Sequence, residues 1–426
     1  MRGPLSRIAL VLTTAGLLCL PALADDSAQS TAQTPASTPL PTTPPEPTTT
    51  PATSTAPEAT IAQATPAPPA KPAAQTSPPA APAPPKPAPQ GAQIKVSDNV
   101  NFRFGTLLQP QVDFSQASTG GYAKNLFLRR VRFIVSGQVA KQVYFFFQTE
   151  NARLGLPNAA GTKTLGAGFQ TIDALAEWRL SKPLNLWVGL IYLPTSREAL
   201  KSSGSEFMID TNTYTYTATT ALAGTGGRDT GFMARGYFLA DHLEYRAGLF
   251  QGLRETGSRN EMRKIARLQY NVFDTELYNM PSYPGSYFGT KKILALGAAY
   301  DAQKDYSGHT ADVYADFPTM FGSAVGTATY QRLDGGKFLT ALQKSNTFVV
   351  DGGVFFKGSK LGPWARYEKR DFATPNSSKN EKRALLGLNY YFAGNTFNIK
   401  AAFGRLSPAV GRKTNQVTLQ MQAFYY

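Results

Sequence analysis

Two arginines, Arg130 and Arg132, lie two residues apart in the stretch from Asn125 to Glu150. Side chains alternate between the two faces of a β-strand, so both guanidinium groups are expected on one face. A guanidinium group is planar, keeps its charge and meets carboxylate or phosphate oxygens in pairs. The spacing therefore predicts reversible binding of small anions.

Cations at later positions follow the same alternation. In the stretch from Leu243 to Leu249, for example, Glu244 and Arg246 alternate with apolar residues. Acidic residues share these polar faces, so an alternative interpretation is that the arginines are paired with carboxylates in a polar wall. The residues that alternation alone nominates are Arg130, Arg132, Arg179, Arg246, Arg267, Arg366 and Lys400.

Other kinds of chemistry have few candidate residues. His242 and His309 are the only histidines, and neither lies near a serine and an acid that could complete a nucleophilic triad. No spacing of His, Cys and Asp suits zinc, and the scattered carboxylates give no acid–base pair. The stretch 224–231 is rich in glycine but lacks the Gly-Lys-Ser/Thr ending of a phosphate-binding loop. The sequence predicts no enzyme, no cofactor and no metal site.

The element that carries Arg130 and Arg132 is expected to be a β-hairpin with one apolar and one polar face. A short polar break at 137–142 separates its two strands, and 143–148 is β-branched and aromatic. The same alternation returns down to the C-terminus in segments of about 10 residues, the pattern of a transmembrane antiparallel β-barrel. The set expected on the apolar face is Phe127, Arg129, Val131, Phe133 and Val135.

The length of the alternating region predicts the number of strands. Some ~330 residues at ~20 per strand and connection give about 16 strands, with 14 and 18 as alternatives, since single-chain bacterial barrels take even numbers. A large soluble β-sandwich would instead need continuous cores of Val, Ile and Leu. The alternating residues expected to face lipid in the last strand end at Tyr425. Tyr426 is one residue beyond them and is interpreted as an appended residue. Aromatic residues expected in interfacial girdles are Tyr390, Tyr391, Phe392 and Tyr425.

The N-terminal sequence predicts that the chain is exported from the cytoplasm. Residues 1–24 combine two arginines, an apolar run and Ala22-Leu23-Ala24, the features of a cleavable signal peptide. The only cysteine, Cys19, lies in this segment, so the mature chain is expected to form no disulfide. No later stretch holds 18 consecutive apolar residues, so any membrane-spanning part would have to use closed strands.

Residues 25–92 are rich in Pro, Ala and Thr and predict a disordered periplasmic spacer. The spacer could be passive, or it could tether the chain to peptidoglycan or to a periplasmic partner. The barrel domain is expected at 93–426. The formal net charge is +15 and falls to +13 when Arg2 and Arg7 leave with the signal peptide. Because the cations are dispersed and the chain is exported, nucleic acid is not a predicted partner. The positive charge could serve general solubility, or it could line the lumen with cations.

The alternation breaks between Pro194 and Gly227. Residues 194–210 show no sustained period, and a run rich in Thr, Tyr and Gly follows. Connections of this length are uncommon and are often functional. The sequence leaves two alternatives open, an exposed loop or a loop folded into the pore.

Several short motifs, in this order and spacing, resemble the family of phosphate-selective porins O and P. The first is an arginine cluster in the second strand, and the next is a Gly-x-x-x-x-Pro-x-Ser-x-Glu-x-Leu-x-Ser segment. The resemblance extends over almost all of 96–426. The motifs are Leu128–Arg132, Gly189–Asp210, Gly227–Gly231, Ala266–Asp274, Trp364–Glu368 and Leu386–Tyr391.

This resemblance implies a 16-stranded, trimeric channel of the bacterial outer membrane, with the spacer in the periplasm. It implies that Arg129, Arg130 and Arg132 are pore cations, and that Arg197 and Lys201 lie in a segment that narrows the pore. The expected function is passive diffusion of small anions, with phosphate or polyphosphate as the family's solutes. The alternatives are a general non-selective porin and a structural protein that the proline-rich arm tethers to the cell wall. Expected partners are outer-membrane lipid, small anions and two further copies of the chain.

Overall fold

A computed structural model describes residues 92–426, except 118, 159, 160, 164, 167, 217–221, 223–225, 255–260 and 278–280. The predicted signal peptide, nearly all of the predicted spacer and part of the glycine-rich stretch 224–231 lie outside the described residues. Within these residues, no helix has the length and apolar character needed to cross a membrane. The short helices are η2 (Glu198–Leu200), α2 (Thr213–Tyr216) and η3 (Asn376–Lys379).

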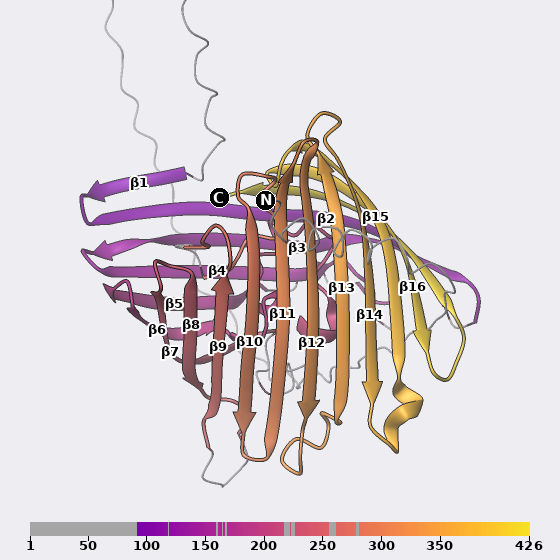
Figure 1. Cartoon of the computed structure of the whole chain (residues 1–426). Coiled ribbons are helices and arrows are strands. Elements are labelled where there is room, and N and C mark those ends of the chain that lie inside the picture. The colour runs from indigo at the N-terminus through magenta and orange to yellow at the C-terminus, as the bar shows by residue number, and fades with distance from the viewer. Residues whose placement is uncertain are drawn as a thin grey trace, which may run out of the picture. The chain divides into compact units, whose positions relative to one another are not determined.

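In the described part of the chain, sixteen antiparallel strands close into a barrel, because β17 pairs with β2 as well as with β16. Strands β9 to β14 form the near wall in Figure 1 and cross the more distant β2 to β5 steeply, as strands tilted in a barrel do. The predicted fold class and strand number are therefore confirmed. The strands are β2 (Val100–Gln116), β3 (Tyr122–Ala140), β4 (Val143–Leu154), β5 (Gln170–Ser181), β6 (Leu184–Tyr192), β7 (Arg228–Phe238), β8 (Leu243–Phe250), β9 (Arg263–Asn271), β10 (Ile293–Gln303), β11 (Tyr306–Thr319), β12 (Gly322–Asp334), β13 (Ser345–Phe356), β14 (Leu361–Phe372), β15 (Glu381–Ala393), β16 (Phe397–Pro408) and β17 (Thr414–Tyr425).

A further short strand, β1 (Ala92–Ser97), extends the seam of the barrel. It pairs with the first residues of β2, from Ala92 opposite Phe104 to Ser97 opposite Val100. Pairing between β17 and β2 ends at Tyr425 opposite Thr106. Strands β1 and β17 therefore meet end to end along the same edge of β2.

The connections differ between the two ends of the barrel. One end carries short turns at 141–142, 182–183, 239–242, 320–321, 357–360 and 394–396. The other end carries the longer connections, among them 155–169, 193–227, 251–262 and 335–344. In transmembrane barrels the short turns lie at the periplasmic end. The connection 272–292 between β9 and β10 breaks this rule, because it is long and starts from the short-turn end.

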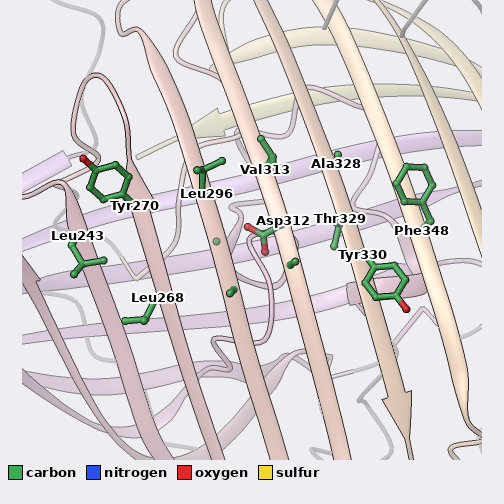
Figure 2. Close-up of a pocket in the computed structure, with 13 residues that line it drawn as sticks. Leu243, Leu268, Tyr270, Leu296, Asp312, Val313, Ala328, Thr329, Tyr330 and Phe348 are labelled. Atoms are coloured by element: carbon green, nitrogen blue, oxygen red, sulfur yellow. The ribbon is translucent and has the colours of Figure 1, made fainter. Parts of the chain in front are cut away.

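Apolar and polar residues separate across the wall as the alternation predicted. On β8 to β13 the outer surface exposes Leu268, Leu296 and Phe348, whereas Arg267 and Asp312 are buried on the inner side. Figure 2 shows the outer apolar side chains on neighbouring strands, where residues such as Leu268, Leu296 and Phe348 line a hollow of the surface. The wall is thus apolar outside and charged inside.

The prediction that four aromatic residues face outward in an interfacial girdle is confirmed for three of them. Tyr390, Phe392 and Tyr425 are exposed on the outer surface near the short-turn end. The prediction for Tyr391 was wrong, because this ring is only 2% exposed and packs inside the barrel against Phe207. One step along a strand reverses the face, so adjacent aromatic residues cannot both face outward.

The predicted faces of β3 are correct for the residues after Arg129 in the sequence and reversed for the residues before it. A β-bulge places Gln109 opposite Arg130 but Pro110 opposite Leu128, so Arg129 is an extra residue in β3. The prediction that Phe127 faces outward was wrong: it is 5% exposed, whereas Leu126 is 71% exposed. The bulge changes the phase of the strand, and this change lets the consecutive residues Arg129 and Arg130 both reach the interior.

Tyr426 is not a loose addition to the last strand. Its hydroxyl lies 2.6 Å from the hydroxyl of Ser136, and its ring stacks on Phe424. The guanidinium of Arg103 lies 4.3 Å from the centre of the same ring. The interpretation of Tyr426 as an appended residue was therefore wrong, because the residue packs inside the short-turn end.

Gly189 in β6 gives a test of the close strand pairing. It has a φ of +124°, and a Cβ there would lie 2.1 Å from the carbonyl oxygen of Ala174 on β5. We expect Gly189→Ala to cost about 1–3 kcal/mol of barrel stability, since the residue is held in a region that side chains avoid. The measurement is the temperature at which the folded band on a semi-native gel is lost. Gly358→Ala, where a Cβ would meet nothing within 4 Å, is the matched control. An unchanged temperature for Gly189→Ala would contradict the strand geometry.

Candidate pore constriction

The connection between β6 and β7 turns into the barrel. We call its residues 194–212 the inner segment, and all of them are buried except Ser202, Asp210 and Thr211. The two ends of the connection are held together by the amide of Leu193, which donates to the carbonyl of Gly227 over 2.9 Å. Of the two alternatives that the sequence left open, the loop folded into the barrel is the correct one. The inner segment therefore narrows the barrel interior.

Arg197 anchors the start of the inner segment. Its guanidinium donates to both carboxylate oxygens of Glu276, over 2.7 and 2.6 Å, and lies 3.6 Å from the centre of the Tyr314 ring. The amide of Arg197 donates to Asp312, whose carboxylate also accepts two hydrogen bonds from Arg267. Removing one partner of an ion pair this deeply buried strongly destabilises the fold, because the other charge stays buried without a counter-charge. The pair therefore fixes the segment in place.

The unusual connection between β9 and β10 supports the inner segment from the short-turn end. The amide of Tyr283 donates to the carbonyl of Leu200 over 2.7 Å, and the amide of Ser202 donates to the carbonyl of Tyr283 over 2.9 Å. The Tyr283 hydroxyl donates to Glu244 on β8. Two connections from opposite ends of the barrel thus meet in its interior.

Lys201 lies between two carboxylates of its own segment. Its Nζ is 2.7 Å from Glu198 and 2.9 Å from Glu206. Burial alone would lower the pKa of Lys201, but these two carboxylates raise it overall, so the lysine stays charged. The other oxygen of Glu198 accepts from the amide of Asn212 over 2.6 Å. These contacts close residues 198–212 into a compact turn.

Side chains from the wall bind the backbone carbonyls of the inner segment. Lys400 Nζ on β16 donates to the carbonyls of Glu206 and Met208, over 2.5 and 2.9 Å. Gln109, Gln422 and Asn389 donate to the carbonyls of Ser203, Gly204 and Phe207, respectively. Glycine at 204 permits this approach, because a Cβ there would lie 2.9 Å from the Phe424 ring. The carbonyls of a buried loop need such partners, and polar side chains of the wall supply them.

The end of the inner segment is held by the bulged arginine pair. Asp210 accepts hydrogen bonds from Arg129 Nε over 2.8 Å and from Arg130 Nη2 over 2.6 Å. The Asp210 carbonyl accepts from Arg366 on β14 over 2.8 Å. Burial would raise the pKa of Asp210, but the charges of Arg129 and Arg130 outweigh it and hold the pKa well below its usual range. Asp210 therefore remains a carboxylate.

Each of the eight cations predicted as pore-lining has a carboxylate partner. Arg132 lies 2.8 Å from Glu150, which also lies 3.6 Å from Arg130. The remaining pairs are Arg129–Asp210, Arg197–Glu276, Lys201–Glu198, Arg246–Glu244, Arg267–Asp312 and Arg366–Asp351. Arg179, nominated by alternation, pairs with Glu177. The paired polar wall that the sequence left open as an alternative is thus present.

The structure brings only some of these cations together. Arg129, Arg130 and Arg132 form one cluster with Asp210 and Glu150. Elsewhere, Asp312 accepts hydrogen bonds from the Arg267 guanidinium and from the backbone amide of Arg197. Sequence reasoning missed the acidic partners Asp210 and Glu150. Glu150 could have been found from the register of the hairpin, since it lies directly opposite Arg132. Asp210 gave no such signal, because its partners are about 80 residues away and only the fold joins them.

Comparisons with known proteins identify a fold. No family model and no curated protein matches the chain. An anion-selective porin from Comamonas acidovorans superposes with a TM-score of 0.54 and 11% identity, covering 76% of this chain and 100% of that chain. OmpF of Salmonella typhi, in complex with daunomycin, gives 0.53 and 12%, covering 78% and 100%.

The trimer form of OmpT from Vibrio cholerae gives a TM-score of 0.51 and 11% identity, covering 77% of this chain and 100% of that chain. At these identities the comparisons establish a shared barrel fold. The fold of this chain is therefore that of outer-membrane porins. The resemblance to the phosphate-selective porins O and P stays a prediction.

The buried Arg197–Glu276 pair gives a test of the inner segment. Glu276→Gln leaves Arg197 buried without a counter-charge, which costs about 3 kcal/mol or more. If the free energy needed to open the segment falls by that amount, trypsin should cleave after Arg197 or Lys201 roughly 100-fold faster. The measurement is mass spectrometry of timed digests of the folded protein in detergent.

Asp241→Asn is the matched control, because it weakens the pair in the short turns between the exposed Lys182 and the partly exposed Asp241. Exposed pairs contribute little, so this variant should digest like the native protein. Equal cleavage rates for Glu276→Gln and the native protein would show that the pair does not hold the segment.

Proposed function

We propose that this chain forms a passive diffusion channel with a preference for small anions. The observation that carries the proposal is the cluster of Arg129, Arg130 and Arg132 on the inner wall, in which three cations share the carboxylates of Asp210 and Glu150. These five residues together have a formal charge of +1, and Asp113 lies close enough to interact electrostatically with Arg129. Ion pathways of this kind attract an ion enough to admit it and hold it weakly enough to release it.

The net charge of the barrel supports the same preference through its less buried residues. Residues 1–91 contain four basic and four acidic residues, so the whole net charge of +15 belongs to residues 92–426. Among the described residues, eleven basic and thirteen acidic residues are buried, so the positive excess lies on residues that are partly or fully exposed. A water-filled path with a positive potential raises the local concentration of anions. In this proposal the pore cations are Arg129, Arg130, Arg132, Arg197, Lys201, Arg246, Arg267 and Arg366.

The site of action in the proposal is the bacterial outer membrane, with the short turns and the N-terminal spacer on the periplasmic side. Apolar strands and exposed aromatic residues near the short-turn end suit contact with lipid. The anion selectivity of the Comamonas acidovorans porin and the trimer form of Vibrio OmpT support an anion channel made of three chains. The family resemblance adds phosphate or polyphosphate as the solute. The spacer is passive in this proposal, and its binding to peptidoglycan or to a periplasmic partner is the alternative.

The channel is tested by the reversal potential across a KCl gradient in planar bilayers. The native protein should favour chloride, and Arg130→Gln/Arg132→Gln should shift the permeability ratio toward potassium. A unit charge acts with about 1 kcal/mol at 4 Å in water, which corresponds to about a fivefold change in ion partitioning. Replacing chloride by phosphate tests the solute, since phosphate should carry current in the native protein.

Two variants serve as controls. Lys264→Gln removes a cation that is exposed on the outer face of β9, so the permeability ratio of chloride to potassium should not change. Arg132→Gln/Glu150→Gln removes one charge of each sign, so the shift should be smaller than for the arginine pair. A native reversal potential near zero would favour the general non-selective porin. A folded protein without any conductance steps would favour the tethered structural protein.

A further inference from the structure

The carboxylate of Asp210 lies where an oxyanion would bind. One of its oxygens accepts from Arg129 Nε and Nη2, over 2.8 and 2.7 Å. The other accepts from Arg130 Nη2 over 2.6 Å, from the Thr211 amide over 2.8 Å and from the Thr211 hydroxyl over 3.4 Å. Two converging guanidinium groups and a backbone amide form the donor set that proteins use for carboxylate and phosphate groups. Here the bound group belongs to the chain itself.

This part of the interior is less enclosed than the anchors of the inner segment, although the Arg130 side chain is only 5% exposed. The side chains of Arg129 and Asp210 are 19% and 25% exposed, whereas Arg197 and Glu276 are 1% and 0% exposed. Asp210 and Thr211 are two of the three inner-segment residues that are not buried. A solute that enters the barrel can therefore reach the Asp210 carboxylate, while the anchors of the segment are shielded.

The inner segment does not depend on the Asp210 side chain alone for its position. Arg366 binds the Asp210 carbonyl, and Lys400 and Asn389 bind the carbonyls of Met208 and Phe207. Glu198 holds the amide of Asn212 on the other side. The side chain of Asp210 can therefore leave the two arginines while the backbone around it stays fixed.

We infer that Arg129 and Arg130 form an oxyanion site, and that Asp210 occupies it as a built-in competitor which a permeating oxyanion must displace. This inference rests on the proposed function, because it assumes that anions pass through the barrel. The ligand class is a small oxyanion with two or more free oxygens, such as phosphate or a carboxylate. A resident carboxylate weakens the net affinity of the arginine pair, so an arriving anion binds only transiently and moves on.

The test is block of the chloride current by inorganic phosphate in planar bilayers. Asp210→Asn keeps the shape of the side chain and removes its charge, so the arginine pair becomes free for phosphate. The concentration of phosphate that halves the chloride current should fall by about tenfold relative to the native protein, as expected for gaining a charge-assisted contact. Asp210→Glu keeps the resident charge and should behave like the native protein.

Three further variants make the experiment specific. Arg129→Gln/Arg130→Gln/Asp210→Asn should lose the gained phosphate block, because the site itself is gone. Asp98→Asn removes an exposed carboxylate in the turn before β2, and phosphate sensitivity should not change. Asp210→Ser replaces Asp210→Asn if the latter does not fold, since a serine hydroxyl can still accept from the Thr211 amide.

The outcomes separate the two proposals. A folded, anion-selective Asp210→Asn channel with native phosphate sensitivity overturns the competitor role and leaves the anion channel standing. Equal phosphate block in Asp210→Asn and in the variant that also lacks both arginines overturns the oxyanion site. A native protein that prefers potassium overturns the proposed anion channel, and the inference fails with it.

Discussion

Pairing of buried charge is the constraint on which the interior of this barrel depends. Charged groups enclosed by an apolar wall are costly unless each finds a counter-charge or hydrogen-bond partners. The inner segment meets this demand with Arg197 against Glu276 and Lys201 against two glutamates, and its carbonyls bind wall side chains. The same contacts determine where the segment lies. Electrostatics inside the barrel therefore sets the geometry of the path as well as its potential.

The arginine cluster on β3 shows how a small irregularity of the wall creates a site. In a regular strand, Arg129 and Arg130 would lie on opposite faces. The bulge opposite Pro110 brings both to the inner face, where they meet one carboxylate. Proline suits this position, since it lacks the amide that a regular ladder would need. A local defect in pairing is thus what concentrates positive charge at one level of the barrel.

The sequence could predict features that depend on neighbouring residues, such as strands and their faces. It could not predict contacts between distant residues that only the closed barrel brings together. Period-two alternation gave the strands, their faces and the cations Arg246, Arg267 and Arg366 on the inner wall. It failed at the bulge, at Tyr391 and at Tyr426, where one residue more or less reverses the face. The acidic partners Asp210 and Glu276 lie about 80 residues from their arginines, so no local pattern could reveal them. Nor could alternation show that the connection between β9 and β10 enters the barrel.

The contacts between the inner segment and the last three strands have a consequence for folding order. Asn389, Lys400 and Gln422 bind residues that lie 182, 194 and 218 positions earlier in the chain. Contacts of such long range form late, because the intervening chain must first be placed. Residues 204–208 of the inner segment can therefore complete their contacts only when the C-terminal hairpins have arrived. Until then its polar backbone must stay hydrated, so barrel assembly and narrowing of the interior become one concerted final event.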